Sequence, residues 1–274
     1  MVDKRLIAAG VAALVLALAA GGVYWWRQRV APPPGMTMPP PVARAPVSAP
    51  APAPSEPVIR HPIEAADAAS APSTTLDRAA LVELLGSKMA NAFVQFDGFV
   101  PRLVATVDNL ARPHAAPRLW PVHPTPGRFT VERSGEAEQI ATANAPRYTP
   151  FVAFAEGIDS RRAVALYRRH YALFQQAWGD LGYPRTYFND RLVEVIDHLL
   201  ATPEPAAPVK VKLTEVKGPE PITQPWLRYE FADPKLDTLS SGQKMLIRMG
   251  PDNARRLKAK LMEVRRLVAS GPAR

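Results

Sequence analysis

Residues 189–200, NDRLVEVIDHLL, carry side chains whose types and spacing are suited to chemistry. On a helix, the spacing of Asp190, Glu194, Asp197 and His198 places three carboxylates and an imidazole along one stripe. Such a stripe suggests a metal site or acid–base catalysis. A zinc or iron site needs at least three protein ligands, and no partner cluster elsewhere in the sequence can be paired with this one.

The same twelve-residue stretch has a simpler interpretation as an amphipathic surface helix. Its apolar residues recur on the side opposite the acidic stripe. Arg191 lies three residues before Glu194 and can pair with it, and Asn189 is a suitable N-cap. We therefore expect a solvated face with local ion pairs. A hydrolytic site built from Asp190, Glu194 and His198 is the alternative.

A second candidate for chemistry is SGQK, residues 241–244, which matches the S-x-x-K motif of penicillin-interacting enzymes. Ser241 would be the nucleophile, with Lys244 one helical turn later. The motif is short, and its companion motifs S-D-N and K-T-G are absent from the sequence. We expect Ser240 or Ser241 to be a helix N-cap, and keep a Ser241/Lys244 hydrolase as the alternative.

A proline-punctuated loop, residues 111–129, is the better candidate for binding. Stiff loops that carry Trp, Tyr and Arg make recognition surfaces, because these side chains give large contact areas at low entropic cost. The alternative is that Trp120 fills the core and the prolines only direct the chain. The expected binding residues are Arg118, Trp120, Arg128, Arg147 and Tyr148.

The basic charge of the folded region is concentrated at its C-terminal end. Residues 75–243 carry 19 basic and 19 acidic side chains, whereas residues 244–274 carry 9 basic and 2 acidic ones. A helix over 252–269 would have a narrow apolar stripe for docking, with cations on its other faces. The expected basic surface, which could attract an anionic partner, consists of Arg255, Arg256, Lys258, Arg265 and Arg266.

Near the N-terminus, Leu6–Trp26 contains 21 residues and no charge. This length spans about 31 Å as a helix, which matches the hydrocarbon core of a bilayer. Tyr24, Trp25 and Trp26 would lie at the membrane interface. The segment predicts a single-pass membrane anchor, and a cleaved signal peptide is the alternative. Residues 1–5 would form a short tail before it.

The stretch that follows the anchor is rich in proline and alanine. Residues 31–74 hold 13 prolines in 44 positions, so this part cannot bury enough apolar surface to fold. We expect a disordered linker over 27–74 and a globular domain over 75–270. The chain has no cysteine, which excludes disulfides and thiolate metal sites, and no nucleotide-binding motif.

The periodicity of the globular region predicts an α+β fold, mainly helical with a small antiparallel sheet. Alternating residues predict a hairpin around Ser134-Gly135 and strands at 209–216 and 226–231. Helical spacing is strongest at 160–181. The expected helices cover 74–96, 98–110, 148–156, 160–181, 189–201, 241–249 and 252–269.

The globular region contains several long strings: VATVDNL, RLWPVHPTPGRF, RYTPFV, YFNDRLVEVIDHLLATPEP, WLRYEFADP and MGPDNARRLKAKL. These strings resemble an uncharacterised bacterial domain-of-unknown-function family, whose members have an N-terminal membrane helix and a Pro/Ala-rich spacer. The resemblance covers nearly all of residues 76–269 and implies a single-pass bacterial envelope protein, with no known activity to carry over.

Two classes of function follow. The first is a tethered interaction module at the bacterial inner membrane, with no cofactor, whose periplasmic domain binds an envelope protein or an anionic surface. The second is a periplasmic hydrolase using one of the two candidate sites. Charges flanking the anchor barely decide its orientation. If the domain were cytoplasmic, its basic end could contact nucleic acid or anionic lipid.

Overall fold

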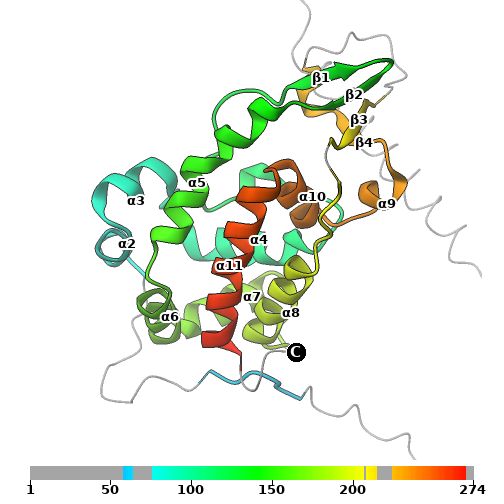
Figure 1. Cartoon of the computed structure of the whole chain (residues 1–274). Coiled ribbons are helices and arrows are strands. Elements are labelled where there is room, and N and C mark those ends of the chain that lie inside the picture. Colours follow the sequence, from blue (N-terminus) through cyan, green and yellow to red (C-terminus); the bar gives the residue numbers. More distant parts are fainter. Residues whose placement is uncertain (1–57, 64–75, 207, 215–223, 270–274) are drawn as a thin grey trace, which may run out of the picture. The chain divides into compact units, whose positions relative to one another are not determined.

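The computed structural model describes residues 58–63, 76–206, 208–214 and 224–269. The described part is mainly helical with one small antiparallel sheet, so the predicted α+β class is confirmed (Figure 1). The expected membrane helix, residues 6–26, lies outside the described residues. Within the described ranges, every helix is too short or too polar to cross a bilayer.

Helices form most of the described domain, and most of them match the expected segments within a few residues. Three short 3-10 turns, Pro117–Leu119, Thr142–Asn144 and Pro225–Leu227, interrupt the loops. The helices are α2 (Arg78–Leu85), α3 (Ser87–Phe93), α4 (Phe99–Leu110), α5 (Ala145–Gly157), α6 (Ser160–Arg169), α7 (Tyr171–Asp180), α8 (Phe188–Leu200), α9 (Pro234–Asp237), α10 (Ser241–Arg248) and α11 (Pro251–Val268).

Two predicted helices are each broken into a pair. The helix expected over 74–96 is interrupted at Gly86, which has the positive φ of 77° that glycine adopts readily, between α2 and α3. The helix expected over 160–181 is interrupted at His170, between α6 and α7. The two halves pack differently: α6 contacts α11, whereas α7 contacts α4.

Helix α11 docks along the domain and contacts α5, α6, α8 and α10 (Figure 1). Its apolar stripe is buried as expected: Val268 is 3% exposed, and Leu261 packs against two groups of buried side chains. The largest apolar core lies where α4, α7, α8, α10 and α11 meet, and includes Val104, Phe174, Trp178 and Phe188.

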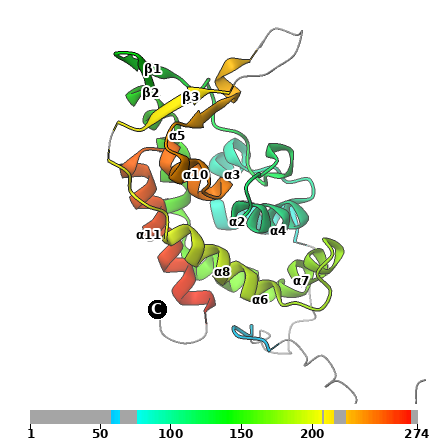
Figure 2. The same ribbon diagram turned by 90° about the vertical axis from the view of Figure 1, so that its right-hand side faces the viewer.

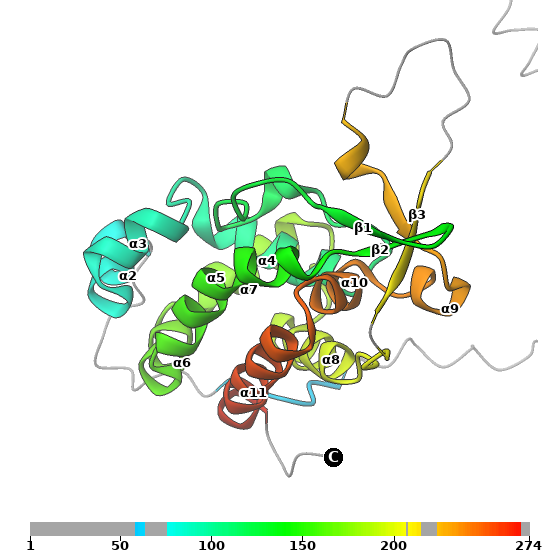
Figure 3. The same cartoon turned by 45° about the horizontal axis from the view of Figure 1, so that its top comes forward.

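The sheet contains β1 (Val131–Ser134), β2 (Ala137–Ile140), β3 (Lys210–Leu213) and β4 (Tyr229–Phe231), in that order and all antiparallel. The expected hairpin is confirmed, with Ser134 paired with Ala137 across the turn. Val211 and Phe231 pack against Ile247 of α10, so the sheet is fixed to the helices through α10 (Figure 3).

Residues 58–63, VIRHPI, lie beside the domain without forming a helix or strand, with a bend at Arg60 and His61, and are called the strap below. We expected this stretch to belong to the disordered linker. Instead, its backbone is hydrogen-bonded to the first turn of α8 and to the adjoining Tyr187 (Figure 2). The acceptors of these hydrogen bonds are the side chains of Asp190 and Tyr187, which are far from the strap in the sequence.

Candidate binding groove

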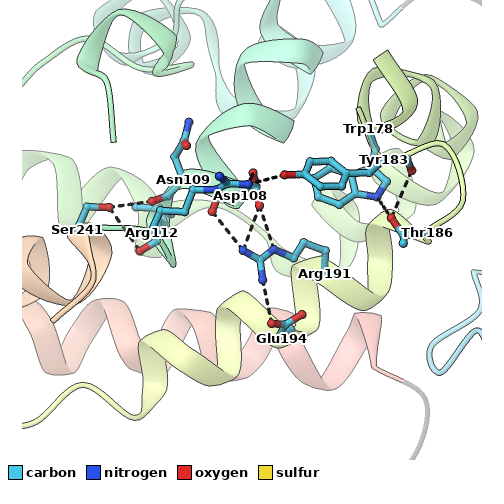
Figure 4. Close-up of polar contacts among 10 residues, drawn as sticks. Asp108, Asn109, Arg112, Trp178, Tyr183, Thr186, Arg191, Glu194 and Ser241 are labelled. Atoms are coloured by element: carbon cyan, nitrogen blue, oxygen red, sulfur yellow. Dashed lines mark hydrogen bonds and ion pairs between the residues drawn. The ribbon is translucent and has the colours of Figure 1, made fainter. Parts of the chain in front are cut away.

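The C-terminal end of α4 is a polar hub built around the carboxylate of Asp108, which is only 4% exposed. Arg112 contacts one carboxylate oxygen at 2.7 Å, and Arg191 contacts the other at 3.0 Å (Figure 4). The guanidinium of Arg112 also donates to the hydroxyl of Tyr183. The hydrogen bond with Asp108 raises the pKa of Arg112, so this guanidinium remains charged.

An open groove of about 900 Å³ lies beside this hub. Its walls come from the end of α4, the α7–α8 loop, the first turns of α8 and the strap. Four arginines and three carboxylates line it together with apolar and aromatic side chains. The charged lining residues are Arg60, Arg112, Arg185, Arg191, Asp108, Asp190 and Glu194.

The strap is held at its side of the groove by hydrogen bonds from its backbone N–H groups to side chains of α8 and Tyr187. The carboxylate of Asp190, 9% exposed, accepts hydrogen bonds from the backbone N–H of His61 at 2.7 Å and of Arg60 at 3.0 Å. The hydroxyl of Tyr187 accepts from the backbone N–H of Ile63 at 2.9 Å. Because these bonds use main-chain groups, they fix the path of the strap and leave most of its side chains available.

Asn189 ties the strap to the end of α11. Its side chain is fully buried, and its amide donates to the carbonyls of His61 and Val268, at 2.9 and 2.8 Å. Tyr167 donates its hydroxyl to the Asn189 side-chain oxygen. Burial raises the pKa of Tyr167, so this hydroxyl stays protonated and keeps donating. The expected role of Asn189 as N-cap is wrong, because Tyr187 occupies that position.

The acidic stripe of α8 is divided among different partners. Asp190 holds the strap, Glu194 pairs with Arg191 at 2.8 Å, and Asp197 pairs with Arg265 of α11. The Nε2 atom of His198 is buried and has no hydrogen-bond partner in the described part of the chain. In the described ranges, no group of three or more His, Asp or Glu side chains is placed to hold a metal ion.

The SGQK segment stabilises the end of α4 and the start of α10, which meet at the polar hub. Ser240 is the N-cap of α10 and forms a capping box with Gln243. The hydroxyl of Ser241, 8% exposed, donates to the carbonyl of Asn109 at 2.8 Å, and so satisfies a free carbonyl at the end of α4 (Figure 4). Lys244 pairs with Asp237 at 3.2 Å. These contacts are structural.

Three of the five expected binding residues of the proline-rich loop make contacts within the domain. Arg147 donates to the carbonyls of Pro126 and Gly127, both at 3.0 Å, and thus holds the loop against α5. Tyr148 packs against the main core. Arg128 stacks on Trp226 at 4.0 Å. Trp120 is partly buried and Arg118 is exposed.

The cations of α11 are largely neutralised by contacts within the domain. Arg256 forms a bidentate pair with Glu156 of α5, and Arg265, 8% exposed, pairs with Asp197 of α8. Lys258 donates to the carbonyl of Thr202 at 2.6 Å, and Arg255 pairs with Asp252. Of the five expected basic residues, Arg266 alone lacks a carboxylate or carbonyl partner among the described residues.

Sequence reasoning missed the groove and most of the residues that form it. It identified Arg191 only as a partner of Glu194, and assigned no role to Asp108, Arg112, Tyr183 or the strap. One signal was present: VIRHPI, with three β-branched residues and no alanine, interrupts an Ala/Pro-rich stretch. Such a break in composition is typical of a segment that packs.

Comparison with known proteins identifies a family. No curated protein matches the sequence, and no solved structure matches the fold. A family model described as "Protein of unknown function (DUF3014)" matches residues 99–265, which include α4, the α7–α8 loop, α8 and most of α11. The chain therefore belongs to the DUF3014 family.

Proposed function

We propose that this protein is a tethered interaction module of the bacterial envelope. In this proposal, Leu6–Trp26 anchors it in the inner membrane by a single pass, and the Pro/Ala-rich segment sets the reach of a periplasmic domain. The domain binds another envelope protein through the groove beside the strap. The unbroken apolar run and its interfacial aromatic residues support the anchor.

One observation carries the binding function: the domain already holds a non-helical polypeptide segment, the strap, on one wall of an open groove. The neighbouring walls offer aromatic and arginine side chains, which are the residue types that dominate binding energies in interfaces, together with apolar ones. Apart from His198, the candidate catalytic residues are held by separate structural partners. An interaction surface accounts for these contacts better than a hydrolytic site.

In-cell photo-crosslinking tests this proposal. A photoreactive amino acid replaces Arg185, which is exposed on the groove, in the full-length protein. A matched variant carries it at Lys88, an exposed residue of α3 that does not line the groove. We expect a discrete, light-dependent adduct to one envelope protein from position 185 only. Identical adducts from both positions, or none from either, would refute the groove as the binding surface.

A reporter fusion tests the membrane part of the proposal. Alkaline phosphatase, which is active only after export, is fused after Arg274. Activity in cells, together with an intact N-terminus on the membrane-bound protein, is the expected result. An inactive fusion would place the domain in the cytoplasm, and a mature N-terminus beginning after residue 19 would indicate a cleaved signal peptide.

A further inference from the structure

The charged side chains of the groove differ in whether they already have partners. Each carboxylate is engaged: Asp108 by two arginines, Glu194 by Arg191, and Asp190 by the strap backbone. These groups therefore have little capacity left for a ligand. Arg191 is likewise occupied, since its guanidinium contacts both Asp108 and Glu194.

Three other arginines of the groove keep unused donors. The guanidiniums of Arg60 and Arg185 have no hydrogen-bond or ion-pair partner within the described residues, and both residues are exposed. Arg112 uses one terminal nitrogen for Asp108 and Tyr183, which leaves its Nε and its other terminal nitrogen unpaired in the described part. The spare binding capacity of the groove is thus cationic and suited to carboxylates.

Apolar surface lies beside these cations. Val58 and Ile59 of the strap are 83% and 50% exposed. Across the groove, Tyr183 stacks on Trp178, with ring centroids 4.0 Å apart, and the buried Trp178 donates its indole N–H to Thr186. This anchoring makes Tyr183 a rigid face against which an apolar side chain can pack.

We propose that the groove binds an extended acidic segment of a partner protein, with carboxylates on Arg60, Arg112 and Arg185 and apolar side chains on Val58, Ile59 and Tyr183. The inference rests on the proposed interaction function and names its partner class. Charge complementarity selects the acidic segment, and the groove volume is within the usual range of binding clefts.

The strap contributes three of these six residues, so the site is complete only when the strap is docked. Partner binding and strap docking therefore stabilise each other, because the free energy of coupling between two binding events is reciprocal. A bound partner would hold Arg60 against α8.

The test measures binding of purified full-length protein to a library of short synthetic peptides in which alternate positions are Glu or Asp and the others are randomised. A matched library replaces the acidic residues by Gln or Asn. We expect wild-type protein to retain acidic peptides preferentially, and most strongly at low salt. Arg112→Gln with Arg185→Gln should weaken binding of the selected peptides by about tenfold or more.

The matched control is Arg255→Gln with Arg266→Gln, which removes the same charge from exposed positions of α11. This variant should bind the selected peptides as wild-type protein does. An equal loss in both variants, or equal retention of both libraries by wild-type protein, would overturn the acidic-peptide site. Binding to phosphatidylglycerol vesicles that depends on Arg112 and Arg185, without peptide binding, would assign the groove to lipid and also overturn it.

A further variant tests the contribution of the strap without changing α8. Val58→Ser, Ile59→Ser and Arg60→Ser together should weaken binding of the selected peptides at least as much as the double arginine variant. Unchanged binding would overturn the shared site. If the acidic peptides do not bind but position 185 still crosslinks one envelope protein, the partner class is wrong and the interaction function stands.

Discussion

The backbone N–H of His61 donates to the carboxylate of Asp190 at 2.7 Å, across 129 positions of sequence. A second bond from Arg60 reaches the same carboxylate. Asp190 begins the stripe that most resembles a catalytic cluster, yet it holds a segment of main chain. Its negative charge, near the N-terminus of α8, is also favoured by the helix dipole.

Asp190→Ala should release the strap while the rest of the domain stays folded. Hydrogen bonds to a charged group each contribute about 1.5–3 kcal/mol, so trypsin should cleave the Arg60–His61 bond at least about tenfold faster. Mass spectrometry of the timed digest identifies this cleavage. Glu194→Gln is the control, because Glu194 is on the same helix but contacts Arg191. Equal cleavage rates in wild type and Asp190→Ala would contradict the docking of the strap.

Asp108→Asn should destabilise the domain by about 3 kcal/mol, because it leaves Arg191 and Arg112 beside a neutral side chain at a largely buried position. Glu194→Gln removes only the exposed end of the same network, and should lower the free energy of unfolding by less than about 1 kcal/mol. Urea unfolding followed by tryptophan fluorescence measures both. Equal losses would show that the buried carboxylate is not the centre of the hub.

Gly242→Ala should destabilise the domain by about 1–3 kcal/mol. A Cβ at this position would lie 2.6 Å from the Leu199 side chain and 2.8 Å from the Leu110 carbonyl, so α10 would have to move away from α4 and α8. Gly157 has no neighbour within 4 Å of its Cβ position, and Gly157→Ala should stabilise the domain by roughly 0.4–1 kcal/mol. The midpoint temperature of thermal unfolding should therefore fall for Gly242→Ala and rise for Gly157→Ala. A change of this temperature in the same direction for both variants would contradict this packing.

Glu156→Gln should destabilise the domain at neutral pH and lose its effect in acid. The hydrogen bond from Arg256 lowers the pKa of Glu156 in the folded protein, so the unfolded chain binds the proton more readily. The stabilisation is therefore present above the usual carboxyl pKa and disappears as the pH falls through the lowered one. Unfolding curves at several pH values measure the difference between wild type and variant.

The control for this pH dependence is Glu136→Gln, in the β1–β2 turn, where the carboxylate has no ion-pair partner in the described ranges. Its stability should follow that of wild type at every pH. High salt should reduce the Glu156 effect, because both partners of the pair are partly exposed. A Glu156 effect that grows as the pH falls would contradict the assigned pairing.

The α+β class, most helix positions and the docking stripe of α11 follow from the sequence, because residue spacing reports which face of an element is apolar. A serine N-cap at 240 or 241 follows in the same way, since capping is a local interaction, and the structure shows that Ser240 takes this role. The membrane anchor and its orientation remain predictions from the sequence, since residues 6–26 lie outside the described part. Periodicity and capping depend on interactions between residues that are close in the sequence, so the sequence alone is enough to predict these features.

The groove was decided by tertiary structure, because its parts are far apart in sequence. Asp108 and Arg191 are 83 positions apart, and Arg60 and Asp190 are 130. No periodicity relates such positions. The same reason explains why Arg256 and Arg265 of α11 are neutralised: their partners, Glu156 and Asp197, are on other helices. The sequence shows which side chains are charged, but only the fold determines which of them remain unpaired.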